Sequence, residues 1–112
     1  MLKNAIHLNP ITPGWYLGRL GEAYRLTGQY EKAVHEYKEG IRLQPDDMFS
    51  HLNLALCYVK LEREADAHAE AAEVLRINPK FSVEGYAKLI ALKDEASKNR
   101  LIDGMRKAGL PE

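Results

Sequence analysis

The sequence has few of the features that mark secreted, membrane-spanning or highly charged proteins. It contains one cysteine, Cys57, which excludes an internal disulfide. No run approaches the ~18 consecutive apolar residues of a membrane-spanning helix. The first residues also lack the unbroken apolar stretch and the small-residue cleavage site of a secretory signal. We therefore expect a cytoplasmic protein, unless the chain is a segment of a longer polypeptide that carries the targeting signal elsewhere.

The sequence also lacks a net charge. Sixteen lysines and arginines balance sixteen aspartates and glutamates. The long-range attraction that draws a protein to a phosphate backbone or to anionic lipid is therefore missing, and we expect neither nucleic acid nor a membrane as partner. A length of 112 residues and a hydrophobic content of 46% suffice for one domain, residues 1–112, with a packed core.

Motifs for catalysis are absent from the sequence. The glycines match neither a dinucleotide-binding nor a phosphate-binding loop, and no HExxH or CxxC occurs. His51 takes the place in an apolar pattern that Leu17 takes earlier, which favours a partly buried histidine with satisfied hydrogen bonds. Asp46 and Asp47 precede a predicted helix, where carboxylates cap the first N–H groups. We therefore predict no catalytic residue, no metal site, no cofactor and no enzymatic activity.

An internal repeat is the strongest signal in the sequence. Five positions recur after 34 residues: Leu20 with Leu54, Gly21 with Ala55, Tyr24 with Tyr58, Ala33 with Ala67, and Pro45 with Pro79. A small residue beside a leucine, an aromatic residue three positions on, a small residue in a second helix and a closing proline are typical of a helix-turn-helix repeat. The pattern resembles the tetratricopeptide repeat (TPR).

The resemblance implies an all-α fold, in which antiparallel helix pairs stack as a right-handed TPR solenoid. We assign two full repeats to residues 14–47 and 48–81, and a degenerate third unit with a C-terminal capping helix to residues 82–112. Residues 1–10 have the pattern of the end of a second helix in an earlier repeat. The predicted helices span residues 14–27, 30–43, 47–61, 64–77 and 95–108, with a further short helix after Ser82, and glycine ends are expected at Gly28 and Gly109.

Each predicted helix has one face for packing. Small residues at Gly21, Ala33, Ala55 and Ala67 would let neighbouring helices approach closely. Cys57 falls among apolar residues, which favours a small buried hydrophobe over a reactive thiol. The opposite face of the predicted helix over residues 30–43 carries charges of both signs and is predicted to be a solvated face. Its residues are Glu31, Lys32, Glu36, Lys38 and Glu39.

The C-terminal end carries a second resemblance. Residues 78–84 and 101–112 are similar to the C-terminal ends of bacterial TPR proteins, including TPR regions that follow class III adenylate or guanylate cyclase domains. No cyclase domain fits in 112 residues. The resemblance therefore implies the terminal repeat array of a larger bacterial polypeptide, with a regulatory role as one reading.

In the TPR family, the first helix of each repeat lines a concave groove that binds protein segments. The resemblance assigns this partner-binding groove to nine residues here: Trp15, Arg19, Glu22, Arg25, Phe49, Leu52, Asn53, Leu56 and Tyr86. Family members that grip acidic C-terminal tails use a set of Lys, Asn and Arg residues. Gly18 and Glu22 stand where that set needs Lys and Asn, so we reject this carboxylate-clamp reading. What remains is an apolar ladder of Trp15, Phe49, Leu52, Leu56 and Tyr86 within a polar rim.

These features favour a non-catalytic protein-protein interaction scaffold that binds an apolar or amphipathic peptide segment. Two alternatives stay open. The C-terminal helix could fold over Tyr86 and Ile90 and make part of the ladder core. The apolar edge formed by Leu2, Ile6 and Leu8 could instead support a homodimer, because a short array leaves a terminal face uncovered.

Overall fold

The computed structural model describes residues 14–90 and 95–112. In these residues the chain forms helices and no strand, so the predicted all-α class is confirmed. Six helices follow one another: α2 (Gly14–Leu26), α3 (Tyr30–Leu43), α4 (Met48–Lys60), α5 (Glu64–Ile77), α6 (Val83–Leu89) and α7 (Glu95–Lys107). The sequence predicts both a first and a last residue for five helices, and these agree closely with the observed bounds. The apolar edge of Leu2, Ile6 and Leu8, and the expected helix end at residues 1–10, lie outside the described residues.

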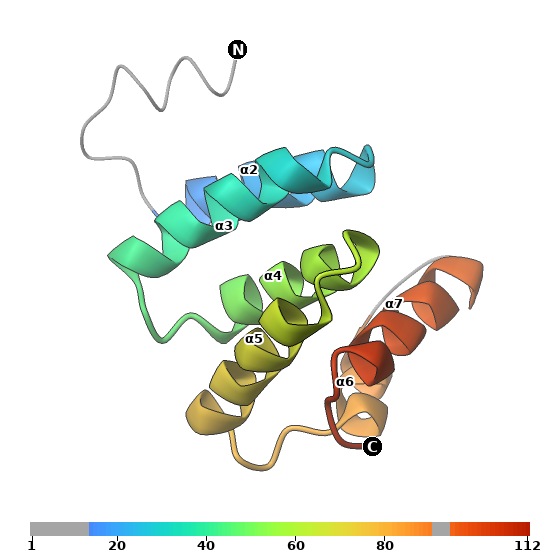
Figure 1. Cartoon of the computed structure of the whole chain (residues 1–112). Coiled ribbons are helices and arrows are strands. Elements are labelled where there is room, and N and C mark those ends of the chain that lie inside the picture. The colour runs from blue at the N-terminus through green and yellow to red at the C-terminus, as the bar shows by residue number, and fades with distance from the viewer. Residues whose placement is uncertain (1–13, 91–94) are drawn as a thin grey trace, which may run out of the picture.

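Consecutive helices pack as antiparallel pairs (Figure 1). α2 pairs with α3, α4 pairs with α5, and α3 joins the two pairs by packing on α4. The pairs stack as a right-handed helical-repeat array. Short α6 and longer α7 form the third unit, in which α7 packs on α4 and covers the end of the array.

The turn between the two helices of each pair has the same hydrogen bonds in both repeats. Gln29 N–H donates to Tyr24 O at 2.8 Å, and Arg63 N–H donates to Tyr58 O at 2.8 Å. Gly28 adopts the left-handed conformation that this turn requires, with φ of 80°. This agrees with the predicted helix end, because glycine takes positive φ without a Cβ clash.

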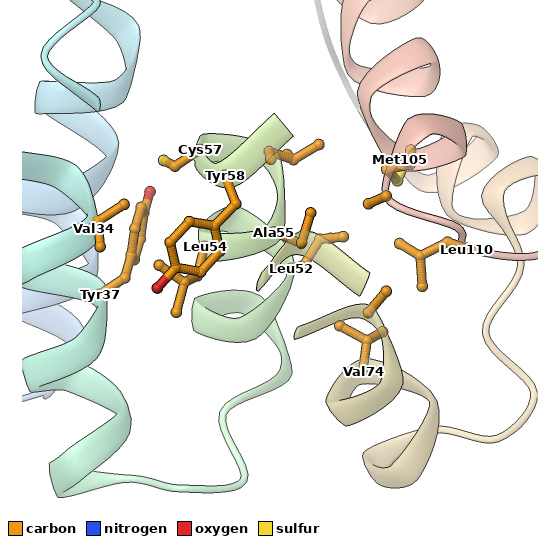
Figure 2. Close-up of a cluster of buried hydrophobic side chains, with 14 of the residues drawn as sticks. Val34, Tyr37, Leu52, Leu54, Ala55, Cys57, Tyr58, Val74, Met105 and Leu110 are labelled. Carbon is orange, nitrogen blue, oxygen red and sulfur yellow. The ribbon is translucent and has the colours of Figure 1, made fainter. Parts of the chain in front are cut away.

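The core lies between the helix pairs and is centred on α4 (Figure 2). Tyr37 of α3 packs against Leu54 and Tyr58 of α4, while Val74 of α5 lies on the other side. The predicted close approaches are confirmed. Ala33, Ala55 and Ala67 are completely buried. A Cβ added to Gly21 would lie 2.9 Å from the ring of Tyr37, so α2 comes as near to α3 as a glycine allows.

The C-terminal unit adds a second part of the core. Met105, Ala108 and Leu110 are buried in the same cluster as Leu52 and Val74. Gly109 ends α7 with φ of 92°, and Leu110 N–H donates to Met105 O at 3.1 Å. This is the predicted glycine end with a following hydrophobic contact. Val83 N–H donates to Pro111 O at 2.7 Å, so the residues after α7 are tied to the start of α6.

One expected surface residue is buried. Glu36 was assigned to the solvated face of α3, but it is only 3% exposed, so this prediction is wrong. Glu36 occupies in α3 the repeat position that Glu70 occupies in α5, and Glu70 faces α4. The position therefore points towards the first helix of its own repeat. The remaining charges of this face are exposed or half-buried, as expected.

Candidate functional site

A groove with a volume of about 950 Å³ runs between the first helices of the two repeats. One wall is the polar side of α2, the other is the first half of α4, and side chains at the end of α6 and on α7 close it. The α3–α4 turn forms one end of the groove. The lining residues are Gly18, Arg19, Glu22, Arg25, Tyr37, Gln44, Pro45, Asp46, Asp47, Phe49, Ser50, Leu52, Asn53, Tyr86, Ile90 and Leu101.

Most of the residues assigned to the groove from the sequence meet at this one place. They are Arg19, Glu22, Arg25, Phe49, Leu52, Asn53 and Tyr86. Leu56 lies instead on a smaller neighbouring pocket. The side chain of Trp15 lies outside the described residues. The first-helix positions of a helical repeat therefore share one concave surface here, which is the arrangement that the repeat spacing implies.

Fewer apolar side chains are exposed in the groove than the predicted ladder contains. Phe49 is 56% exposed, and its ring centroid lies 6.4 Å from that of half-buried Tyr86. Leu52 and Leu56, by contrast, are only 1% and 6% exposed. A Cβ on Gly104 of α7 would come within 2.8 Å of Leu56 Cδ2. Helix α7 thus covers Leu56, whereas Tyr86 and Ile90, for which the sequence left such covering open, are half-buried and line the groove.

The acidic end of the groove is occupied by structural interactions. Asp47 Oδ1 accepts from Phe49 N–H at 3.2 Å, and its Oδ2 accepts from Ser50 Oγ at 2.8 Å. Asp46 accepts from Arg76 Nη2 at 2.8 Å across the surface. Asp47 is the N-cap of α4, as the sequence predicted. Neither carboxylate is therefore free to serve as the main recognition group for a ligand.

A buried histidine, His51, lies beside the acidic end of the groove and connects the elements around it. His51 is 4% exposed, with Nδ1 at 2.7 Å from Glu70 Oε1 and Nε2 at 2.8 Å from Pro45 O. Both ring nitrogens have partners, so the predicted satisfied histidine is confirmed. The interaction connects α4 to α5 and to the α3–α4 turn, and so fixes the turn that ends the groove.

The floor of the groove contains two polar atoms without partners. Tyr37 is 1% exposed, yet its hydroxyl makes no hydrogen bond, and the buried Nε of Arg25 makes none either. Burial raises the pKa of the Tyr37 hydroxyl, and the nearby charge of Arg25 lowers it in part. Helical spacing from Ala33 predicts from the sequence only that Tyr37 lies on the buried side of its helix. Its unpaired hydroxyl depends on which side chains surround the ring tip, and the repeat pattern carries no signal of that.

Cys57 lies in the core beneath the groove. It is completely buried, and burial raises the pKa of its thiol to about 12, with a smaller lowering by Arg25. The thiol is therefore protonated near neutral pH, and thiolate is the reactive form. The prediction of a small buried hydrophobe is confirmed.

The described residues show no sign of two other kinds of site. They contain no group of three or more His, Cys, Asp and Glu side chains placed to hold a metal ion. None of the described helices combines the length and the apolar character needed to cross a membrane.

Known proteins match both the sequence and the fold. Residues 21–62 match the family model described as TPR repeat. The structure also resembles the first TPR of Spaghetti (RPAP3) bound to the HSP90 peptide SRMEEVD, with a TM-score of 0.61 and 19% sequence identity. That match covers 85% of this chain and 70% of the other. These matches support a TPR protein.

Two curated proteins are similar in sequence to part of this chain. The chain is 33% identical over 67 residues to the BBSome complex member BBS4 homolog of Drosophila melanogaster, which is 60% of this chain and 14% of that protein. It is 29% identical over 73 residues to Hsp70-Hsp90 organizing protein 3 of Arabidopsis thaliana, which is 65% of this chain and 13% of that protein. The chain thus spans a small part of these relatives.

TPR domains are protein-interaction modules and typically non-catalytic scaffolds. This agrees with the expectation of a scaffold at the level of the domain. The expected origin in a bacterial, cyclase-like polypeptide is untested by these matches and stays a prediction.

Proposed function

We propose that this TPR protein is a non-catalytic scaffold whose groove binds an apolar or amphipathic peptide segment. The groove of about 950 Å³ between α2 and α4 is the observation that carries the proposal. An aromatic side chain that is 56% exposed, Phe49, lies in it beside polar side chains. Exposed aromatic residues within a polar rim are typical of surfaces that bind peptides. The structurally similar first TPR of Spaghetti (RPAP3), which is bound to an HSP90 peptide, is a further support.

Phe49 and Tyr86 would form the apolar contact with the ligand. Their tilted rings lie 6.4 Å apart and leave an edge on which an aliphatic or aromatic side chain can pack. Arg19 is exposed and Asn53 is half-buried, and both line the groove on opposite walls. Their side chains can donate hydrogen bonds to the peptide backbone and so set its direction.

Leu52 and Leu56 take a different role in this proposal. Both are buried, so they hold α4 against the rest of the core rather than contact the peptide over a large area. Trp15 remains a predicted groove residue, and it is the only tryptophan in the chain. Its emission is therefore a convenient reporter of peptide binding.

The affinity should be modest. About two repeats offer a small contact area, and a flexible peptide loses conformational freedom when it binds. A dissociation constant on the order of micromolar is expected.

The test begins with peptides selected on the immobilised protein from a displayed library of short random sequences. The strongest peptide is then titrated into wild type, Phe49→Glu and Lys38→Glu, where Lys38 is an exposed residue of α3 away from the groove. Phe49→Glu should weaken binding by about tenfold or more, since it places a charge at the apolar contact. Equal binding by wild type and Phe49→Glu, or a loss in Lys38→Glu alone, would place the binding surface elsewhere.

Self-association is the alternative function. It rests on the sequence pattern of Leu2, Ile6 and Leu8, which lie outside the described residues. Sedimentation over a wide range of concentrations would detect a dimer, and Ile6→Glu should dissociate it. A sedimentation coefficient equal to that of the monomer at all concentrations, in both proteins, would exclude the homodimer.

A further inference from the structure

A smaller pocket branches from the groove at the end opposite to Asp46 and Asp47. Its volume is about 220 Å³, and it lies where the ends of α2 and α4 meet α7. Arg25 and Leu101 line both the pocket and the groove. Lys60 and Arg100 also line the pocket, whereas no aspartate or glutamate among the described residues does. The charged side chains that line the pocket are therefore all cationic, although Lys60 and Arg100 also line a neighbouring pocket with Glu62, Glu64 and Asp103.

The arginines of the chain divide into two groups. Four of them hold a carboxylate at 3.0 Å or less: Arg42 with Glu39, Arg63 with Asp66, Arg76 with Asp46, and Arg106 with Glu112. The other three are Arg19, Arg25 and Arg100, and each lines the groove or its branch. None of these three has a carboxylate partner among the described residues. Among the described residues, the guanidinium groups without a carboxylate partner thus lie at one surface, where Arg100 donates to Ser97 Oγ at 3.1 Å.

Of the three arginines, Arg25 is the one with a buried side-chain atom that has no hydrogen-bond partner. Its Nε is buried and has no hydrogen-bond partner, and the same holds for the hydroxyl of Tyr37, which lies near enough to feel the charge of Arg25. A buried donor that loses water without gaining an acceptor destabilises the free protein. A carboxylate would accept from a guanidinium in a strong, charge-assisted hydrogen bond. These two buried atoms are closed to solvent, so a ligand carboxylate would pair with the part of the Arg25 guanidinium that lines the pocket.

We propose that the peptide bound in the groove carries an acidic side chain that enters this branch and pairs with Arg25, Lys60 and Arg100. The inference rests on the proposed function, since the rest of the segment lies on Phe49 and Tyr86. The peptide backbone would run in the larger groove, while the branch at its end is small enough to fit the side chain of an aspartate or glutamate. The partner segment is thus amphipathic, with an apolar residue and an acidic residue at a fixed spacing.

The peptides selected on the wild-type protein give the first test. They should share an aspartate or glutamate at a constant distance from an apolar residue. Selected peptides without an acidic residue at a constant position would overturn this inference and leave the groove proposal intact. Failure to select any peptide would overturn the proposed function and this inference with it.

A double-mutant cycle gives the second test. The protein variants are Lys60→Gln and Arg100→Gln, because both side chains are exposed and their replacement spares the core. Each variant is titrated with two peptides, both amidated at the C-terminus. One is the selected peptide, and in the other its acidic residue is replaced by asparagine or glutamine. Either change alone should weaken binding by about fivefold or more, and both together should cost less than the sum of the two, because the acidic residue interacts with the replaced side chain. Binding by wild type should also weaken as salt is raised.

The contrary results are distinct. Additive losses in the cycle would show that the acidic residue pairs elsewhere. The variant Lys38→Gln, which removes one positive charge away from the groove, is the control. A requirement for a free peptide terminus in place of the acidic side chain would identify a terminal carboxylate as the ligand and overturn the proposal. If Phe49→Glu weakens binding while Lys60→Gln and Arg100→Gln do not, the groove remains the binding site and only this inference fails.

Discussion

Glu62 takes in the second repeat the left-handed backbone conformation that Gly28 takes in the first. Their φ angles are 59° and 80°. The two turns are otherwise alike, since the residue that follows donates its N–H to the equivalent tyrosine carbonyl in each repeat. A side chain in this conformation costs about 1–2 kcal/mol relative to glycine, because its Cβ approaches a carbonyl oxygen. The second turn therefore holds strain that the first turn lacks.

The first prediction follows from this strain. Glu62→Gly should stabilise the protein by about 0.5–1 kcal/mol, because the relief of strain exceeds the greater chain entropy of glycine. Glu62→Ala is the matched control, since alanine also has a Cβ and should not stabilise. Urea unfolding followed by circular dichroism measures both. A stabilisation of equal size in the two variants would point to the loss of the Glu62 charge instead of the backbone.

The second prediction concerns the close approach of the helices. Ala67→Leu should lower the free energy of unfolding by about 1–3 kcal/mol, because the site is completely buried and has no room for three more carbon atoms. Lys38→Ala on the exposed side of α3 should change it by less than about 0.5 kcal/mol. Chemical denaturation compares the two variants. Similar losses would show that the assigned helix faces are wrong.

The third prediction tests the buried histidine. Glu70→Ala removes the acceptor of His51 Nδ1 and should cost about 1–3 kcal/mol, because a buried polar nitrogen loses its partner. The control is Glu73→Ala, which removes an exposed ion pair with Arg76 at 3.2 Å and should cost less than about 1 kcal/mol. Thermal unfolding at neutral pH distinguishes them. The prediction fails if Glu73→Ala is the more destabilising change.

The fourth prediction is a loss of stability in alkali. The folded-state pKa of Cys57 is about 12, above its ordinary value of 9.0, so the folded protein keeps a proton that the unfolded chain releases. Stability from this group is complete below about pH 9 and declines as pH rises towards 12. Burial also raises the pKa of Tyr37, which adds a decline of the same sign at higher pH.

Urea unfolding of wild type and Cys57→Ala between neutral and alkaline pH measures this effect. The alanine variant is less stable at neutral pH because it leaves a small cavity, but its stability should fall less steeply above pH 9. The slope for wild type can exceed that of the variant by at most about 1.4 kcal/mol for each pH unit. Parallel slopes would mean that the thiol ionises equally in both states.

The sequence predicted the helices well because their ends depend on local chemistry. Glycine after α2 and α7, proline after α3 and α5, and Asp47 and Ser82 at helix starts act within a few residues of where they stand. The close contacts at Gly21 and Ala67 were also predictable, since a small residue in a repeated apolar pattern has few other reasons to recur.

The parts that the sequence did not predict depend on long-range packing. Periodicity shows that Leu52 and Leu56 lie on one face of α4, but it does not show that α7 covers that face. The same limit applies to Glu36, whose charge favoured the surface and whose position on α3 is buried. The Nε of Arg25 is unpaired because of how helices distant in the sequence pack around it. No local sequence pattern could therefore have predicted it.

The contact between Gly21 and Tyr37 has a consequence for the groove between α2 and α4. The ring of Tyr37 stands behind α2, and its tip reaches the groove floor beneath α4. Any side chain at position 21 would push α2 outward, because its first carbon would meet that ring at 2.9 Å. The width available to a ligand thus depends on Gly21, which does not itself line the groove. Related proteins could change the size of the segment they accept by exchanging this one small residue while every lining side chain stays the same.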